Sequence, residues 1–398
     1  MRPTLSPSLP NQLRRSDLDW LRVLAVLLLV PFHSALVFVQ DPHSIMYVKD
    51  TLNSPELMRI ASFVHQFHMP LLFFIAGFSS FYALGVRNAG QYLGERARRL
   101  LVPALFGTVV LLPPMTYITQ ISRGREVSFW QHYLGFFQLK TYDLAGIGGS
   151  FTPGHLWFIL YLSFFSLLAL PIFVWLRQNA SGRRVIIVLQ HLMARPWAIL
   201  LFAVPLTLAA AVNLLDDKNP LYYFTVFFLG YLLATGERYQ DALDRATPFA
   251  LSLGIVFEIL RQSLRLDMTP WSSTWIAYGV MENLNRWLWV LALLGLGHYF
   301  LNRQGRVLAY LSEAAFPFYV LHLPIDTLVA YFIIKLPLGV APKYLLIVAL
   351  TMALTFAVYE AVKRVAPLRF FLGLKPSKRA LQYPAPAVPA PLDQALRG

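Results

Sequence analysis

Ionisable side chains interrupt the first long apolar stretch of the chain, residues 17–39. Asp19, Arg22 and His33 lie in a run long enough for an α-helix to cross a bilayer core, which takes about 20 residues. An ionisable group at membrane depth costs roughly 2.5 to 3.5 kcal/mol, so each of them is a candidate functional residue. Arg22 and His33 are eleven residues apart, so they share one helix face, with His33 about 16 Å deeper. The imidazole suits a general base, whereas the structural alternative is an Asp–Arg pair at a helix start and one buried, hydrogen-bonded His.

More imidazoles occur in other apolar stretches, and we expect them in the outer half of the membrane. His65 and His68 stand near the start of the second stretch, His155 and Trp157 at the start of the fourth, and His322 inside the ninth. A metal site on His65 and His68 is not expected, because an i,i+3 pair supplies too few ligands. Candidates for lining an acceptor site or tuning His33 are His68, His155, Trp157, Glu258 and His322.

A basic cluster, G-E-R-A-R-R-L at residues 94–100, stands at the predicted start of the third stretch. Arg96 and Arg99 are three residues apart, so we expect them to be neighbours on one helix face. Guanidinium groups bind phosphate bidentately, and the start of a helix also favours an anion. The cluster therefore predicts a phosphate site, and an ordinary group of cytoplasmic basic residues is the alternative.

The composition is that of a membrane protein. Apolar residues make up 57% of the 398 residues and charged residues only 14%, whereas soluble domains average about 25% charged. The net charge of +14 comes from short Lys and Arg clusters between apolar stretches, which is typical of cytoplasmic loops and argues against nucleic-acid binding. The absence of cysteine excludes disulfides, thiolate metal sites and a Cys nucleophile.

The apolar stretches predict an all-α, polytopic integral membrane protein with about ten transmembrane helices. They are 17–39, 60–84, 98–120, 155–177, 197–214, 220–236, 247–262, 284–302, 312–335 and 341–363. The first stretch contains Arg22 and has no convincing A-x-A cleavage site, so we expect a retained helix rather than a signal peptide. We expect a disordered segment over 1–16, a transmembrane domain over 17–365, and a basic, then Ala/Pro-rich tail over 366–398.

The distribution of basic residues predicts the orientation. With the N-terminus in the cytoplasm, 22 of the 34 Lys and Arg residues fall on the inner side and 11 on the outer side. This bias predicts that both termini are cytoplasmic.

These residues together resemble the acyltransferase 3 family of bacterial integral membrane O-acyltransferases. The first helix of that family carries an Arg, ten intervening residues and a His, here Arg22 and His33. The Arg-x-x-Arg motif of the family matches Arg96 and Arg99.

The likeness extends over about residues 16–376. Further matching segments are H-M-P-L-L-F-F-I-A-G-F at 68–78 and H-L-W-F at 155–158. The segments L-D-W-L-R, L-H-L-P and Y-E-A-V-K-R-V-A-P-L-R-F-F-L-G-L-K-P are most similar to members that attach succinyl groups to periplasmic glucans.

The resemblance implies an acyl-CoA-dependent transferase in the bacterial inner membrane. Acyl-CoA, as co-substrate and most simply succinyl-CoA, would enter from the cytosol with its phosphates on Arg96 and Arg99. Its arm would pass Arg22, which could hold a phosphate or the acyl carboxylate, or simply pair with Asp19. A hydroxyl of a glucan or another carbohydrate would meet the thioester at His33. A homo-oligomer and partner proteins of glucan synthesis are open alternatives.

Two other classes of protein remain as alternatives. Buried ionisable groups and interrupted helices also mark solute transporters, but the sequence has no obvious internal repeat. A polysaccharide flippase or polymerase would differ by transferring no acyl group.

Overall fold

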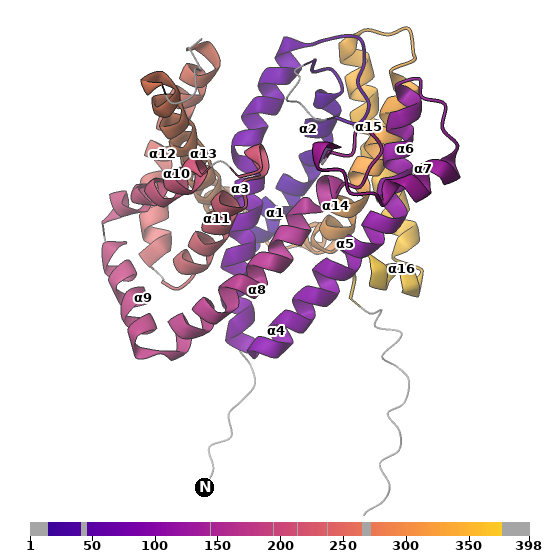
Figure 1. Ribbon diagram of the computed structural model, residues 1–398. Helices are drawn as coiled ribbons and strands as arrows, with labels where there is room; N and C mark the ends of the chain where they lie inside the picture. The colour runs from indigo at the N-terminus through magenta and orange to yellow at the C-terminus, as the bar shows by residue number, and fades with distance from the viewer. Residues whose placement is uncertain are drawn as a thin grey trace, which may run out of the picture.

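The computed structural model describes residues 15–40, 46–143, 145–193, 195–212, 214–236, 238–264 and 272–375, and the described residues are helical with connecting turns (Figure 1). The long or spanning elements are α1 (Ser16–Leu27), α2 (Leu29–Leu36), α3 (Pro55–Val86), α8 (Trp157–Gln178), α10 (Ala203–Ala211), α11 (Pro220–Leu233), α12 (Arg238–Ser263), α13 (Ser273–Phe300), α14 (Arg306–Ile333) and α15 (Val340–Val362). The shorter elements are α4 (Ala89–Arg96), α5 (Val102–Phe106), α6 (Leu112–Ser122), α7 (Phe129–Phe136), α9 (Ala180–Leu192) and α16 (Ala366–Phe371).

Six of the described helical stretches are long and apolar enough to cross a membrane. Two further apolar helices, Trp197–Ala211 and Pro220–Leu233, are shorter. The predicted all-helical, multi-pass architecture agrees with this arrangement, while the count of ten spans stays a prediction. Helices α12 and α13 are long but carry several charged side chains, which lowers their hydropathy.

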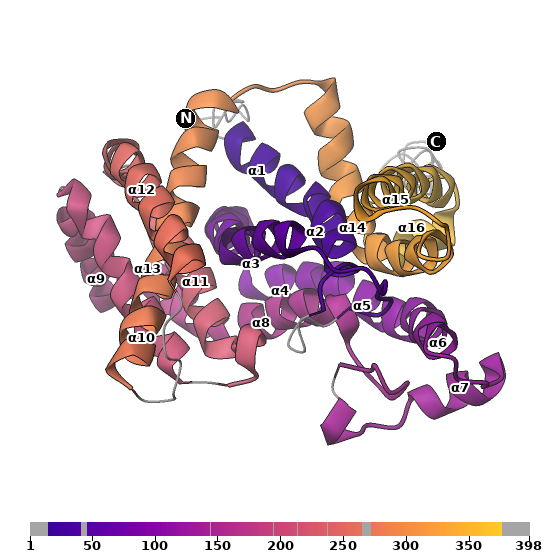
Figure 2. The ribbon, with the colours of Figure 1, turned by 90° about the horizontal axis from the view of Figure 1, so that it is seen from above.

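The bundle is built around the N-terminal helices. Seen from above, α1, α2 and α3 lie between a group formed by α14 and α15 and a group formed by α10, α11, α12 and α13 (Figure 2). Helix α3 packs against α11, and α14 packs against α1, α2 and α15. His33, on α2, is therefore surrounded by elements distant in sequence.

The first predicted helix is interrupted between α1 and α2, at Leu28. Pro31 explains the break, because proline has no N–H to bond the carbonyl of Leu27 and its ring crowds that carbonyl. The interruption separates the Arg22 segment from the His33 segment.

The third span begins earlier than the sequence predicted. Asn88 and Gln91 form a capping box that starts the helix at Ala89, and helical structure then continues to Ser122. Two π-helical segments, Ala97–Leu101 and Gly107–Leu111, interrupt its α-helical geometry.

This boundary corrects one part of the phosphate argument. Arg96 ends α4 and Arg99 lies in the first π-helical segment, so both are inside the helix rather than at its start. The predicted support from free N–H groups of a helix N-terminus is therefore wrong. Regular i,i+3 spacing on one α-helical face is also lost at this point.

Helices α3 and α11 approach each other closely through glycine. A Cβ on Gly77 would lie 1.8 Å from the Phe227 carbonyl oxygen, and a Cβ on Gly230 would lie 2.2 Å from the Phe74 carbonyl oxygen. Small residues allow such backbone contact between membrane helices. This packing sets the position of α3, which carries His65 and His68.

The fold extends past the predicted domain boundary at 365. Helix α16 packs against α5, with Phe371 stacked on Phe106 and Leu372 buried. Helical structure therefore continues past residue 365, and its apolar side chains pack on the third span, while the predicted division into domains stays a prediction. The predicted segment 1–16, except for its last two residues, and the tail beyond Lys375 lie outside the described residues.

Candidate active site

Histidines from four elements gather around α2. The ring centres of His33 and His322 are 5.4 Å apart, and those of His322 and His155 are 5.3 Å apart. Phe32 lies 4.8 Å from the His68 ring. His68, His155 and His322 are buried, and His33 is partly exposed. The structure thus brings together four side chains that the sequence singled out.

Backbone carbonyls determine the tautomers of three of these rings. A carbonyl only accepts, so His322 donates from Nδ1 to Tyr319 at 2.6 Å and His68 donates from Nδ1 to Val64 at 3.0 Å. His155 donates from Nε2 to the carbonyl of Val320 at 2.9 Å.

Pro324 frees the backbone carbonyl that accepts the His155 hydrogen bond. Because proline has no N–H, the carbonyl of Val320, four residues earlier, is released from the helix ladder. The Tyr319 hydroxyl also donates to the His155 carbonyl. The L-H-L-P segment thus holds His155 as well as carrying His322.

His33 differs from these three rings. Its Nδ1 is buried and has no hydrogen-bond partner among the described residues. Nδ1 of His155 and Nε2 of His322 are also buried without a partner in the described part of the chain, so His33 is distinguished by its partial exposure rather than by a free nitrogen. A general base must be within reach of the hydroxyl whose proton it takes.

A buried carboxyl that the sequence analysis missed lies beside the histidines. Asp326 accepts a hydrogen bond from Ser34 at 2.7 Å and from Thr351 at 3.3 Å. It is fully buried, and its Oδ2 has no partner in the described structure. Asp326 stands four residues after His322 within an apolar span. This ionisable residue in such a span could have been recognised as a candidate from the sequence.

Asp19 and Arg22 form the structural pair that the sequence left as an alternative. Arg22 lies on α1 and donates to Asp19 at 3.0 Å, with 38% of the Arg22 side chain exposed. The two residues lie before the Pro31 break, whereas His33 lies beyond it. Their catalytic assignment stays a prediction.

Arg96 and Arg99 have different partners. Arg96 donates to Ser80 Oγ at 2.9 Å and lies over the Tyr92 ring. Arg99 Nε is 3.3 Å from a Glu95 carboxylate oxygen, and Glu95 also pairs with Arg87 at 2.6 Å. Basic side chains thus outnumber the carboxylate in this cluster, and anion binding there stays a prediction.

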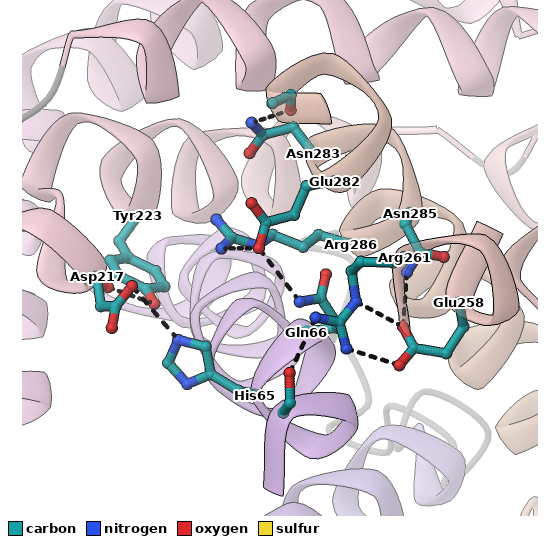
Figure 3. Close-up of polar contacts among 12 residues, drawn as sticks. His65, Gln66, Asp217, Tyr223, Glu258, Arg261, Glu282, Asn283, Asn285 and Arg286 are labelled. Atoms are coloured by element: carbon teal, nitrogen blue, oxygen red, sulfur yellow. Dashed lines mark hydrogen bonds and ion pairs between the residues drawn. The ribbon is translucent and has the colours of Figure 1, made fainter. Parts of the chain in front are cut away.

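Trp157 and Glu258 lie in different surroundings from the histidines. The Trp157 ring is 5.2 Å from Tyr223 and 5.9 Å from Phe73. Glu258 is buried and pairs with Arg261 at 2.7 Å, within a polar cluster of α3, α12 and α13 (Figure 3).

The turn before α11 brings two charges to this side of the bundle. Asp217 lies 3.9 Å from His65 Nε2, and Tyr223 donates to the Asp217 carbonyl. Burial lowers the pKa of the adjacent Lys218, and the neighbouring Asp217 carboxylate partly opposes this effect. Among the described residues, no group of three or more His, Asp and Glu side chains could hold a metal ion.

Comparison with known proteins shows the family of the chain. Residues 15–360 match the acyltransferase domain of the acyltransferase 3 family. The chain is 23% identical to glucans biosynthesis protein C of Salmonella enteritidis PT4 (strain P125109) and of Salmonella agona (strain SL483), over 91% of this chain and 95% of theirs. No solved structure matches the chain. The chain therefore belongs to the acyltransferase 3 family.

Proposed function

We propose that this chain is an O-acyltransferase that moves a short acyl group, in the first place succinyl, from cytosolic acyl-CoA to a hydroxyl of a periplasmic glucan. The single observation that supports this chemistry is the partial exposure of His33, beside the buried rings of His68, His155 and His322, which makes His33 the ring of the four that a hydroxyl can reach. The glucan comes from the similarity to glucans biosynthesis protein C, and the succinyl group comes from the family resemblance of the sequence motifs.

In the proposed reaction His33 acts as the general base. It takes the proton of the acceptor hydroxyl while the hydroxyl oxygen bonds to the thioester carbonyl carbon. The carbon–sulfur bond then breaks, and the CoA thiolate takes the proton back from the imidazolium. General-base catalysis of this kind contributes about 10² to 10⁴ in rate. An acyl-His33 intermediate is the other route open to the same residue.

The donor reaches His33 from the side of the basic cluster. Arg96 and Arg99 would hold CoA phosphates, since guanidinium groups bind phosphate well. The extended arm of the donor spans a distance comparable to the rise between Arg22 and His33, about 16 Å. The acceptor would enter from the opposite end, near His155 and Trp157.

The decisive experiment is mass spectrometry of the periplasmic glucan fraction from cells with the intact gene, without it, and with His33→Ala. The proposal expects a succinyl mass increment only with the intact protein. His191→Ala is the matched control, because His191 is exposed and lies on α9. Unchanged glucans in cells with the intact gene would reject the glucan assignment, and normal acylation by His33→Ala would reject the base assignment.

A further inference from the structure

Two carboxylate–guanidinium pairs lie side by side where α12 and α13 face α3 (Figure 3). Arg261 holds Glu258 with two hydrogen bonds of 2.7 and 3.0 Å. Arg286 donates to Glu282 at 2.9 Å. Glu258 is the only member of these two pairs that the sequence analysis considered.

Each pair has its carboxylate bonded by one amide side chain, from α3 for Glu282 and from α13 for Glu258. Gln66 donates to Glu282 at 3.4 Å and Asn285 donates to Glu258 at 3.0 Å. Arg261 also donates to the Ser62 hydroxyl of α3. Gln66 therefore lies between the two ion pairs, one helical turn after Ser62 (Figure 3).

The carboxylates determine how these amides are oriented. An ionised carboxylate only accepts, so each amide must turn its NH₂ group toward the carboxylate and its oxygen away. Gln66 Oε1 and Asn285 Oδ1 consequently have no donor in the described structure. The two residues are only 1% and 0% exposed, and a buried acceptor without a donor is costly.

A ligand that donates hydrogen bonds can satisfy these two acceptors. Hydroxyl groups of a sugar can donate to amide oxygens and accept from Arg286, whose Nε also has no hydrogen-bond partner. A carboxylate ligand has no proton to donate.

The cluster is connected to the histidines through α3. His65 stacks on Phe32, with ring centres 6.2 Å apart, and Phe32 directly precedes His33. His65 also lies 3.9 Å from Asp217, which is 70% exposed. Side-chain contacts thus connect His65, which precedes Gln66, to an exposed carboxylate and to the residue before His33.

We propose that the cluster of Gln66, Glu258, Arg261, Glu282, Asn285 and Arg286 binds the acceptor as a polyhydroxylated carbohydrate. This inference rests on the proposed function and assigns the place where the acceptor is held before its hydroxyl reaches His33. The residues act in acceptor binding and take no part in the proton transfer.

The test uses the purified full chain in lipid nanodiscs, with succinyl-CoA as donor and gluco-oligosaccharides as acceptor. Gln66→Leu removes the amide that donates to the Glu282 carboxylate. Glu282→Gln removes the negative charge that orients the Gln66 amide. Each is expected to raise KM for the oligosaccharide by about 10- to 100-fold, the range for a lost hydrogen bond to a charged group. KM for succinyl-CoA is expected to stay the same. Gln190→Leu is the matched control. Gln190 also donates a hydrogen bond, to the Thr235 carbonyl that follows the C-terminal end of α11, but it does not belong to the cluster.

A binding measurement on the unmodified chain keeps the inference testable if a variant folds poorly. Oligosaccharide is expected to raise the unfolding temperature, and succinate is not. Stabilisation by succinate alone would overturn the inference in favour of a carboxylate site. Normal transfer with an unchanged acceptor KM in both variants would overturn this site and leave the proposed function standing. An unmodified chain that transfers no succinyl group would reject both.

Discussion

Ser34 donates a 2.7 Å hydrogen bond to Asp326, and this bond joins the residue after His33 to the helix that carries His322. Both partners are fully buried. Thr351 of α15 donates to the same carboxyl oxygen, so three helices meet at one carboxyl. We infer that Asp326 is a positioning residue, which sets the orientation of α2 and hence of the His33 ring.

Removing the Ser34 hydroxyl tests this role. Ser34→Ala leaves a buried acceptor on Asp326 with one donor fewer, which costs about 1 to 3 kcal/mol, and kcat is expected to fall because His33 is held less well. Asp326→Asn keeps an oxygen that accepts the Ser34 hydrogen bond, so it should lower stability and kcat less than Ser34→Ala does. Thermal unfolding and succinyl transfer are measured on each variant. Ser166→Ala is the control, since Ser166 is equally buried but its Oγ has no partner; equal effects at both serines would contradict the positioning role.

The basic cluster of the third span is expected to act on the donor alone. Arg96→Ala and Arg99→Ala should each raise KM for acyl-CoA by about tenfold, the loss of one charge-assisted contact, without changing KM for the acceptor. Arg364→Ala provides the comparison, because the Arg364 side chain is 77% exposed. If initial-rate measurements give an unchanged KM for both variants, the cluster is an ordinary group of membrane-flanking basic residues.

A buried ion pair lies beyond the C-terminal end of α2. Lys343 of α15 donates to Asp50 at 2.7 Å, and both side chains are at most 5% exposed. The Asp50 N–H in turn donates to the Val37 carbonyl.

Lys343→Met should destabilise the protein by about 3 to 5 kcal/mol, because it leaves the Asp50 carboxylate buried without its ammonium partner. Lys363→Met removes a more exposed partner of Glu360 and should cost only about 0 to 1 kcal/mol. Denaturant unfolding in mixed micelles compares the two. If Lys343→Met lowered the free energy of unfolding less than Lys363→Met does, the Asp50 carboxylate would not depend on Lys343 as its partner.

Because α3 packs closely on α11, we expect alanine substitutions at two glycines to change stability in opposite directions. Gly77→Ala places a methyl group 1.8 Å from the Phe227 carbonyl oxygen, so the helices must separate, at a cost of about 1 to 3 kcal/mol or more. Gly279→Ala meets no atom within 4 Å and should stabilise α13 by about 0.5 to 1 kcal/mol. Expression level and unfolding temperature measure both, and equal tolerance of the two substitutions would contradict this helix contact.

The orientation of the chain can be tested directly. A reporter fused after Lys375 is expected to be active in the cytoplasm, because the Lys and Arg residues are concentrated on that side of the predicted spans. Paired alkaline phosphatase and fluorescent-protein fusions report the two sides. A periplasmic signal would require an odd number of crossings or an inverted chain, and the donor could then not approach Arg96 from the cytosol.

Local sequence was sufficient to predict the helices and to single out several candidate residues. Apolar runs of spanning length predict helices because a backbone in lipid must satisfy its own hydrogen bonds. His33, His155 and His322 stood out because an imidazole within such a run is unusual. The start of the third span was missed because the Asn88–Gln91 capping box, rather than the apolar run, determines where that helix begins.

Only the tertiary structure decided which side chains meet. Ser34 and Asp326 are separated by 292 residues, and Gln66 and Glu282 by 216. Hydropathy gives no information about such pairs, because it is the same for any rotation of a helix about its own axis. The rotation and crossing of the helices depend on close contacts such as that between Gly77 and Phe227. The apolar sequence therefore determines that these helices form, and packing between them determines that His33 faces His322 and that the two ion pairs face α3.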